Sequence, residues 1–200
     1  MYILGISCYY HDSAAALVHD GLLVAASEEE RFSRIKHDSS FPTNAIEFCL
    51  KSAGITAKEL DYVVFYEKPF TKFERIFLNS FKNAPRSGYF FRESMKEWFL
   101  DKLWIKGHII SNLKIDHKKL LFSEHHLSHM ASAFYSSPFE KSALLSIDAV
   151  GEWTTTAWGI GEGNKISIKE EIRFPLRARN DVRCINQKLM IKFCICIRRK

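Results

Sequence analysis

The feature that most constrains the fold is a pattern of strands that occurs twice along the chain. Residues 13–32 read SAAALVHDGLLVAASEEERF, and residues 154–174 read TTTAWGIGEGNKISIKEEIRF. Both contain a strand of small residues, a tight turn, a longer strand, an acidic pair and Arg-Phe. An apolar strand and a polar loop precede each copy, over residues 2–13 and 142–153. Such a repeat predicts two lobes of one α/β design, closing on a nucleotide between them.

The elements between the two copies follow from local signals. Asp20-Gly21, between two apolar runs, predicts a hairpin, and a helix is expected from Pro42-Thr43 until Gly54 stops it. Hydrophobic spacing predicts helices over residues 72–82 and 91–113, and a third that contains the histidines and ends at Pro138. Strands are expected over residues 61–66, 119–122, 142–148, 154–160 and 165–172.

The charge distribution argues against a nucleic-acid-binding protein. The net charge is +6, but residues 176–200 hold eight of the 29 Lys and Arg residues and only one of the 23 acidic ones. The first 175 residues therefore carry a net charge of −1, so no nucleic-acid partner is expected.

Composition also bears on the compartment. No apolar run is long enough to span a bilayer, so no membrane partner is expected. The start of the chain, MYILGISCYYHD, lacks the basic leader of a signal peptide, and the five cysteines show no framework spacing. These features predict a cytoplasmic protein.

A histidine pair and an aspartate form the candidate metal site. His125 and His129 stand four residues apart, so on a helix they project from one face. Asp148 closes an apolar run that is typical of a buried strand. Two imidazoles and a carboxylate suit a divalent metal, although a histidine pair alone is more often solvated or satisfied within a core.

Four blocks of the sequence carry a family resemblance. YYHDSAAALVHDG, EEERFSRIKHDSSFPTNAI, EHHLSHMASAFYSSPF and SIDAVGEWTTT resemble, in this order, the carbamoyltransferase family of nodulation and antibiotic-tailoring O-carbamoyltransferases. The resemblance runs from Met1 to about Pro175. It implies an actin-like ATPase (ribonuclease-H-like) lobe with a mixed sheet and flanking helices, similar to the tRNA threonylcarbamoyl transferase domain, followed by the first strands of a second lobe.

The resemblance also implies roles for individual residues. His125, His129 and Asp148 match the family's ligands for a divalent metal, such as iron or magnesium, while a further aspartate ligand of the second lobe has no counterpart here. His11 is the candidate general base, although a loop histidine bonded to backbone is nearly as good an interpretation. In the loop after the second lobe's first strand, Gly151 and Glu152 are candidates for binding nucleotide or phosphate.

Four further residues are candidates for contacting an anionic substrate: Asp12, Arg34, Lys36 and His37. The alternative for the basic members is a solvated edge that pairs with Glu28, Glu29 and Glu30.

The domain boundaries follow from the repeat and from the limit of the resemblance. Residues 1–138 are expected to form the first lobe, and residues 139–175 the beginning of a second, truncated one. Residues 176–200 are basic, contain three cysteines and show no periodicity. Because the likeness breaks off where composition changes, we expect this tail to be non-native or frameshifted and to stay outside the core.

The sequence therefore predicts an N-terminal fragment of an O-carbamoyltransferase. In that family, ATP and carbamoyl phosphate give a carbamoyl-adenylate, and the carbamoyl group then passes to a hydroxyl of a small molecule. The fragment is expected to be inactive by itself, and its open sheet edge favours poor solubility or homo-oligomers. One alternative is a tRNA threonylcarbamoyl transferase, which EHHLSH and GEWTTT disfavour; another is a non-catalytic, metal-binding remnant.

Overall fold

The computed structural model describes residues 1–200 except 11, 86, 101–103, 149–151, 174–192 and 199–200. The chain divides into two compact units, each of which is described by itself. Unit 1 contains residues 1–69 and 92–123, and unit 2 contains residues 70–91 and 124–200.

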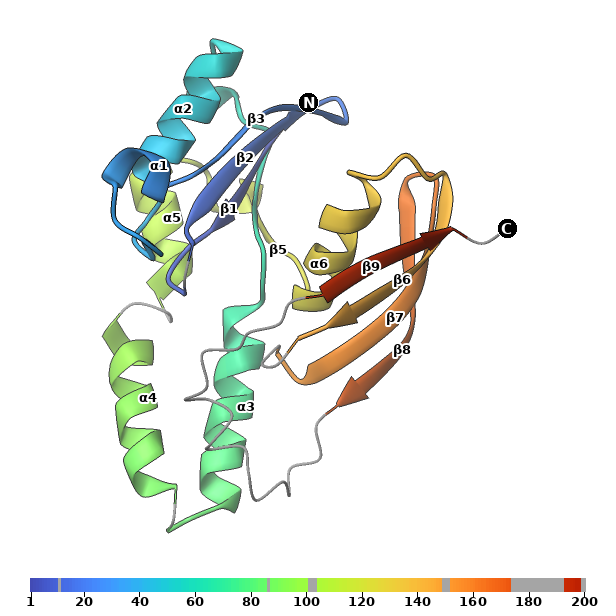
Figure 1. The fold of residues 1–200 in the computed structure, drawn as a ribbon. Coiled ribbons are helices and arrows are strands. Elements are labelled where there is room, and N and C mark those ends of the chain that lie inside the picture. Colours follow the sequence, from blue (N-terminus) through green and yellow to red (C-terminus); the bar gives the residue numbers. More distant parts are fainter. Residues whose placement is uncertain (11, 86, 101–103, 149–151, 174–192, 199–200) are drawn as a thin grey trace. The chain divides into compact units, whose positions relative to one another are not determined.

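Unit 1 is built on a mixed sheet of five strands in the order β3-β2-β1-β4-β5 (Figure 1). β1 pairs antiparallel with β2 and parallel with β4, β2 pairs antiparallel with β3, and β4 pairs parallel with β5. The strands are β1 (Tyr2–Ser7), β2 (Ala14–His19), β3 (Leu22–Glu28), β4 (Tyr62–Phe65) and β5 (Leu120–Phe122).

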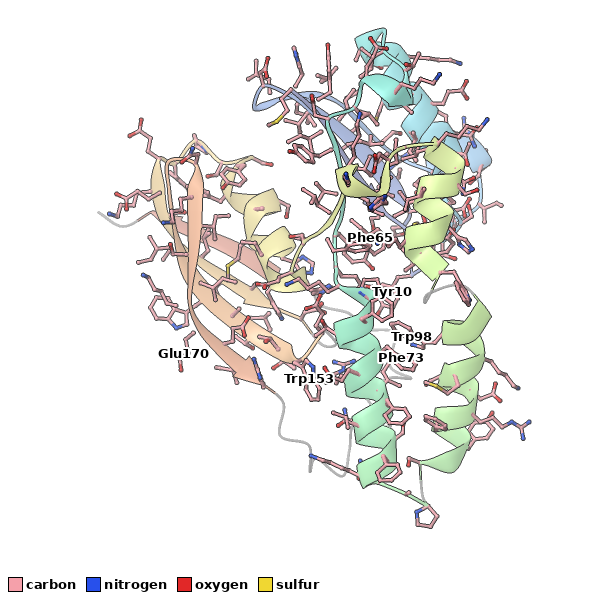
Figure 2. All side chains as sticks on the ribbon, turned by 180° about the vertical axis from the view of Figure 1, so that it is seen from behind. Tyr10, Phe65, Phe73, Trp98, Trp153 and Glu170 are labelled. Atoms are coloured by element: carbon pink, nitrogen blue, oxygen red, sulfur yellow. The ribbon has the colours of Figure 1, made fainter. Side chains whose placement is uncertain are left out.

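Helices complete unit 1 and enclose its core. They are α1 (Glu30–Ser33), α2 (Thr43–Ala53), α5 (Ile105–Leu113) and the 3₁₀ turns η1 (Ala57–Glu59) and η3 (His117–Lys119). α2 packs on β2 and β3 and ends as predicted, because Gly54 adopts the left-handed conformation at its C-cap. The core gathers apolar side chains from the sheet, α2 and α5, with Phe65 fully buried among them (Figure 2).

The predicted helix over residues 91–113 is divided in the structure. α4 (Gly88–Leu100) ends at Leu100, and α5 begins at Ile105. The predicted helix over residues 72–82 is confirmed as α3 (Pro69–Lys82), which belongs to unit 2 from Phe70 onward.

Unit 2 repeats the strand pattern of unit 1. β6 (Lys141–Ile147), β7 (Thr154–Glu162) and β8 (Lys165–Arg173) form an antiparallel meander, as β1, β2 and β3 do. α6 (His125–Phe134) lies against one face of this sheet, although its residues fall in the range predicted for the first lobe (Figure 1). The α/β class and the repeated strand pattern predicted from the sequence are therefore confirmed.

The opposite face of this sheet carries a cross-strand pair. Trp158 on β7 lies opposite Glu170 on β8, and its Nε1–H donates to Glu170 Oε2 at 3.0 Å (Figure 2). Ala157, the neighbour of Trp158, is buried on the α6 side. The alternation shows that only one face of the sheet is covered by α6.

The predicted tail falls mostly on residues that the structure does not describe. Of its described residues, Phe193–Arg198 form β9, which pairs antiparallel with β6. β9 thus occupies beside β6 the place that β4 occupies beside β1, but runs in the opposite direction. The expectation that the tail stays outside the core is therefore wrong for residues 193–198, because β9 is hydrogen-bonded into the sheet beside β6. The non-native origin of the tail stays a prediction. In the described part of the chain, no helix is long and apolar enough to cross a membrane.

Candidate metal centre

The candidate metal centre lies within unit 2, where α6 meets the end of β6. His125 and His129 stand one helical turn apart on α6, and Asp148 directly follows β6. The backbone N–H of Asp148 donates to the carbonyl oxygen of Thr155 at 2.8 Å, which fixes the strand end. His125 and Asp148 are both buried, and His129 is partly exposed.

The three side chains direct one atom each to a common point. His125 Nε2 lies 2.5 Å from Asp148 Oδ2 and 3.2 Å from His129 Nε2, and His129 Nε2 lies 3.7 Å from Asp148 Oδ2. Ligands of one ion at bond lengths of about 2.0–2.2 Å lie roughly 3–3.6 Å apart. The donor set, two imidazoles and one carboxylate, is also typical of a divalent transition metal. The two separations that involve His129 are close to this range, whereas His125 and Asp148 are joined by a hydrogen bond and would have to move apart by about half an ångström to hold one ion. By type and convergence the residues present fit a divalent ion, with His129 on the open side of the site.

His126 anchors the helix that carries these ligands. It is buried, with Nδ1 2.8 Å from Ser146 Oγ on β6 and Nε2 2.8 Å from the Thr154 carbonyl oxygen at the start of β7. Because a carbonyl only accepts, Nε2–H donates and Nδ1 accepts from the Ser146 hydroxyl, which defines a neutral tautomer. Burial lowers the pKa of His126 below its ordinary value and so favours that neutral form. His126 thus fixes the position of α6 over the sheet without adding charge.

Close packing fixes α6 along the rest of its length. Met130 and Phe134 are buried against Leu144 and Ala157 of the sheet. A Cβ on Gly161 would come within 2.8 Å of the Phe134 ring, so the helix rests on β7 where that strand has no side chain. The position of the two histidine ligands therefore depends on how tightly α6 packs.

Unit 1 holds a second group of candidate residues around the loop that follows β1. His37 Nδ1 lies 2.8 Å from Asp12 Oδ1, and the backbone N–H of His37 donates to Glu30 Oε2 at 3.0 Å. One ligand atom of each of these residues falls in a second cluster of metal-ligand type, but Asp12 and Glu30 are partly exposed, His37 is exposed, and the three are already hydrogen-bonded. Arg34 and Lys36 lie exposed on the neighbouring segment.

The backbone has an unusual conformation in this loop and in the segment that follows α1. A positive φ, between 53° and 64°, occurs at Tyr9 and Asp12 in the loop and at Arg34 and His37 in the segment, and it costs energy in non-glycine residues. Backbone hydrogen bonds of 2.8 Å join Tyr9 to Ser39, and Ser13 to Asp38 and Glu29. Tyr9 Oη is also 3.1 Å from His108 Nδ1 on α5. Hydrogen bonds therefore fix both ends of the loop after β1, at Tyr9 and at Ser13.

Buried ionisable groups lie next to that loop. Burial, with the charge of Glu67 adding to it, raises the pKa of the Cys8 thiol from 9.0 to about 12. Burial and Glu67 likewise raise the pKa of Tyr66. The raised pKa values favour the protonated forms of both groups at neutral pH, which argues against Cys8 as a nucleophile.

The structure brings some of the predicted site residues together and leaves others apart. His125, His129 and Asp148 converge in unit 2, and Asp12 and His37 pair in unit 1. Glu152 is half-buried and has no part in either cluster. His11 and Gly151 lie outside the described residues.

Two important residues were missed by sequence reasoning. His126 is one; the other is Glu29, which was considered only as a partner for a basic edge. Glu29 is buried, and its carboxylate accepts from the backbone N–H groups of Asn44 and Ala45 and from Asn44 Nδ2, at 2.6–3.1 Å. It caps the N-terminus of α2 from a distant element. One sequence signal pointed to this capping role. Three glutamates precede α2, and the first turn of α2 contains no acidic residue.

Comparison with known proteins gives a consistent set of relatives. Residues 2–191 match the family model described as carbamoyltransferase N-terminus. The chain is 51% identical over 181 residues to the uncharacterized protein sll1178 of Synechocystis, which covers 87% of this chain and 29% of that protein. It is 34% identical over 161 residues to the nodulation protein NolNO of Sinorhizobium fredii, covering 79% of this chain and 22% of NolNO.

The chain matches less than a third of the length of each of these two curated relatives. A solved structure similar to this chain is YeaZ from Pseudomonas aeruginosa, at 13% identity and a TM-score of 0.45, covering 87% of this chain and 66% of YeaZ.

Proposed function

Because the chain belongs to the carbamoyltransferase family, whose N-terminal domain it matches, we propose that it is the metal-binding part of an O-carbamoyltransferase. The observation that carries this proposal is the convergence of His125 Nε2, His129 Nε2 and Asp148 Oδ2 at one point. Family membership alone would leave open whether this chain keeps a usable site. The geometry supports one, because all three donors converge on one point and only the hydrogen-bonded His125 and Asp148 would have to move apart.

Each residue of the site would have its own role. His125 and His129 would bind the ion from one helical face, Asp148 would supply a negative charge, and neutral His126 would orient the helix. A divalent ion bound there supplies a Lewis acid that polarises an acyl or phosphoryl oxygen. His11, which lies outside the described residues, is our candidate for the general base.

The proposed reaction is transfer of a carbamoyl group from carbamoyl-adenylate to a hydroxyl of a small molecule. The acceptor oxygen forms a bond to the carbamoyl carbon, the bond from that carbon to the adenylate oxygen breaks, and AMP leaves. His11 takes the hydroxyl proton. ATP and carbamoyl phosphate would be the sources of the adenylate, and Asp12, Arg34, Lys36, His37, Gly151 and Glu152 remain candidates for contacting the substrates.

The first experiment measures metal. We expect the purified chain to retain a divalent ion weakly after dialysis, because three protein ligands hold it less firmly than four. His129→Ala should reduce the metal content to background, since it removes one ligand at a partly exposed position. His117→Ala, which removes an exposed histidine on η3, is the matched control and should retain the metal. Equal metal in the parent and in His129→Ala would contradict the proposal.

The second experiment separates a carbamoyltransferase from a metal-binding remnant. 5′-O-(N-carbamoylsulfamoyl)adenosine, a stable analogue of carbamoyl-adenylate, is added to the chain loaded with Mn²⁺, and the line widths of its purine protons are measured. Paramagnetic broadening that disappears in His129→Ala supports an adenylate site next to the ion. Metal binding without broadening in the parent would favour the remnant.

A third measurement concerns turnover. With radiolabelled carbamoyl phosphate, ATP and a mixture of hydroxyl acceptors, we expect no labelled product from this chain alone, because it spans less than a third of its relatives. A labelled product that depends on His11 would show that the chain is sufficient by itself.

A further inference from the structure

α3 exposes a row of large apolar side chains. Phe70, Phe77, Leu78 and Phe81 recur at helical spacing on one side, and Phe70 and Phe81 are 68% and 77% exposed. The rings of Phe77 and Phe81 stack, with centroids 6.5 Å apart. We call these four residues the aromatic face of α3.

The burial of α3 leaves several large apolar side chains in water. Lys72 and Ser80 are buried, and Phe73 and Ile76 are half-buried, whereas Phe70, Leu78 and Phe81 stay exposed. Phe77 is partly covered, because its ring meets that of Phe91 on α4 with centroids 6.0 Å apart. Amphipathic helices normally bury their apolar side and leave the charged side in water. Phe70, Leu78 and Phe81 are thus apolar surface that the described part of this chain does not cover, which is typical of an interaction surface.

Two exposed charges lie on the same side of the helix. Glu74 sits between Phe70 and Leu78, and Lys82 follows Phe81. Among the described residues, neither side chain makes a hydrogen bond or an ion pair. The face therefore carries one negative and one positive group at fixed positions on either side of Leu78.

We propose that the aromatic face of α3 binds the same face of a second copy of this chain, with the two helices antiparallel. Glu74 and Lys82 each lie four residues from Leu78, in opposite directions. With a two-fold axis at Leu78, Lys82 lies opposite the partner's Glu74 and Glu74 lies opposite the partner's Lys82. Each group is about 6 Å along the helix from the axis, at a rise of about 1.5 Å per residue.

This pairing accounts for the charges as well as the apolar surface. Two equivalent ion pairs form on either side of Leu78, while Phe77, Leu78 and Phe81 of both copies are removed from water. A parallel arrangement would instead put Glu74 opposite Glu74 and Lys82 opposite Lys82. The charges thus favour a second, antiparallel copy of the chain as the partner of the aromatic face. This inference does not depend on the carbamoyltransferase proposal.

The test is the oligomeric state of the 200-residue chain, measured by sedimentation velocity from micromolar to several hundred micromolar concentration. The parent should form a dimer, and Phe81→Ser should raise its dissociation constant at least about tenfold, as expected for an aromatic anchor. Leu22→Ser, which removes a similarly exposed apolar side chain from β3, should leave the dimer intact. Circular dichroism checks that each variant is folded.

A charge exchange tests the antiparallel register. Glu74→Lys and Lys82→Glu should each raise the dissociation constant, because each places like charges across the axis twice. The double variant Glu74→Lys/Lys82→Glu restores opposite charges and should return the constant to within about twofold of the parent. Additive losses in the double variant would overturn the proposed register.

Other modes of association give different results. If the exposed edge of β8 mediates association, Ile172→Lys will abolish it and Phe81→Ser will not, which would overturn the proposal. A chain that stays monomeric at every concentration would also overturn it, including one that floats with anionic lipid vesicles.

Discussion

Replacing His126 by leucine tests whether this residue holds the histidine helix in place. The substitution keeps a side chain of similar volume but removes both hydrogen bonds of the imidazole. The Ser146 hydroxyl and the Thr154 carbonyl oxygen would then lose a partner in a buried environment, since Ser146 is 1% exposed. We expect unit 2 to be destabilised and the metal to be held less tightly.

The magnitude follows from the two partners. Leaving a buried polar group unsatisfied costs about 1–3 kcal/mol, so two such groups predict a loss of about 2–6 kcal/mol in the free energy of unfolding. His126 is neutral in the folded chain, so no lost ion pair adds to this figure. With a urea dependence of about 2 kcal/mol per molar, the unfolding midpoint should fall by roughly 1–3 M.

The assay is urea unfolding followed by circular dichroism, with a double-mutant cycle to identify the cause. Ser146→Ala removes the hydroxyl that His126→Leu leaves unsatisfied, so the double variant should recover about 1–2 kcal/mol of the loss. His117→Leu, at an exposed position, should stay within about 0.5 kcal/mol of the parent. If the effects of His126→Leu and Ser146→Ala simply add, the hydrogen bond does not contribute and the reasoning is refuted.

Three further substitutions test the supports of the fold. Glu29→Ala should destabilise unit 1 by about 2–4 kcal/mol in urea unfolding, because three donors at the start of α2 lose a charged acceptor, whereas Glu47→Ala on the exposed side of α2 should change little. Gly161→Ala should lower the free energy of unfolding by about 1–3 kcal/mol and release metal, because its Cβ collides with the Phe134 ring of α6. Gly107→Ala, in open space on α5, should raise the free energy of unfolding by about 0.5–1 kcal/mol, and equal effects of the two variants would contradict the packing. Folding raises the pKa of Cys8, so its contribution to stability is present below pH 9.0 and is lost as the pH rises toward about 12. Cys8→Ala should therefore lose less stability than the parent between pH 9 and 11, and parallel curves would be inconsistent with the raised pKa.

Much of the fold could be predicted because its signals are local. The turn at Asp20-Gly21 and the helix stop at Gly54 lie at positions where the backbone has positive φ, and these residue types accept it. The division between α4 and α5 could not be predicted, because no Pro or Gly separates them and Ile105 and Ile109 continue the apolar stripe. β9 was not predicted at all, because the tail shows no periodicity and its partner β6 lies about 50 residues earlier in the chain.

The candidate site divides in the same way. His125 and His129 could be paired from their spacing, and Asp148 from its place after an apolar run. His126 could not, because a neighbour in sequence points about 100° away on a helix and was expected to face elsewhere. His126 anchors α6 because the helix is buried on two sides. One side supplies the candidate metal ligands, and the other contacts Ser146 and Thr154 through His126. Glu29 was missed because its partners on α2 lie 15 and 16 residues further along the chain.

The same helix therefore couples the metal site to the stability of unit 2. Asp148 is a buried carboxylate, and a buried charge is costly unless an opposite charge or hydrogen bonds compensate it. His125 compensates it in part at 2.5 Å, and a divalent ion among the three ligands would compensate it further. Because the ligands converge only when α6 is docked by His126 and Phe134, an ion binds the folded unit in preference to the unfolded one. Binding must then stabilise unit 2, and any substitution that loosens α6 must weaken the site.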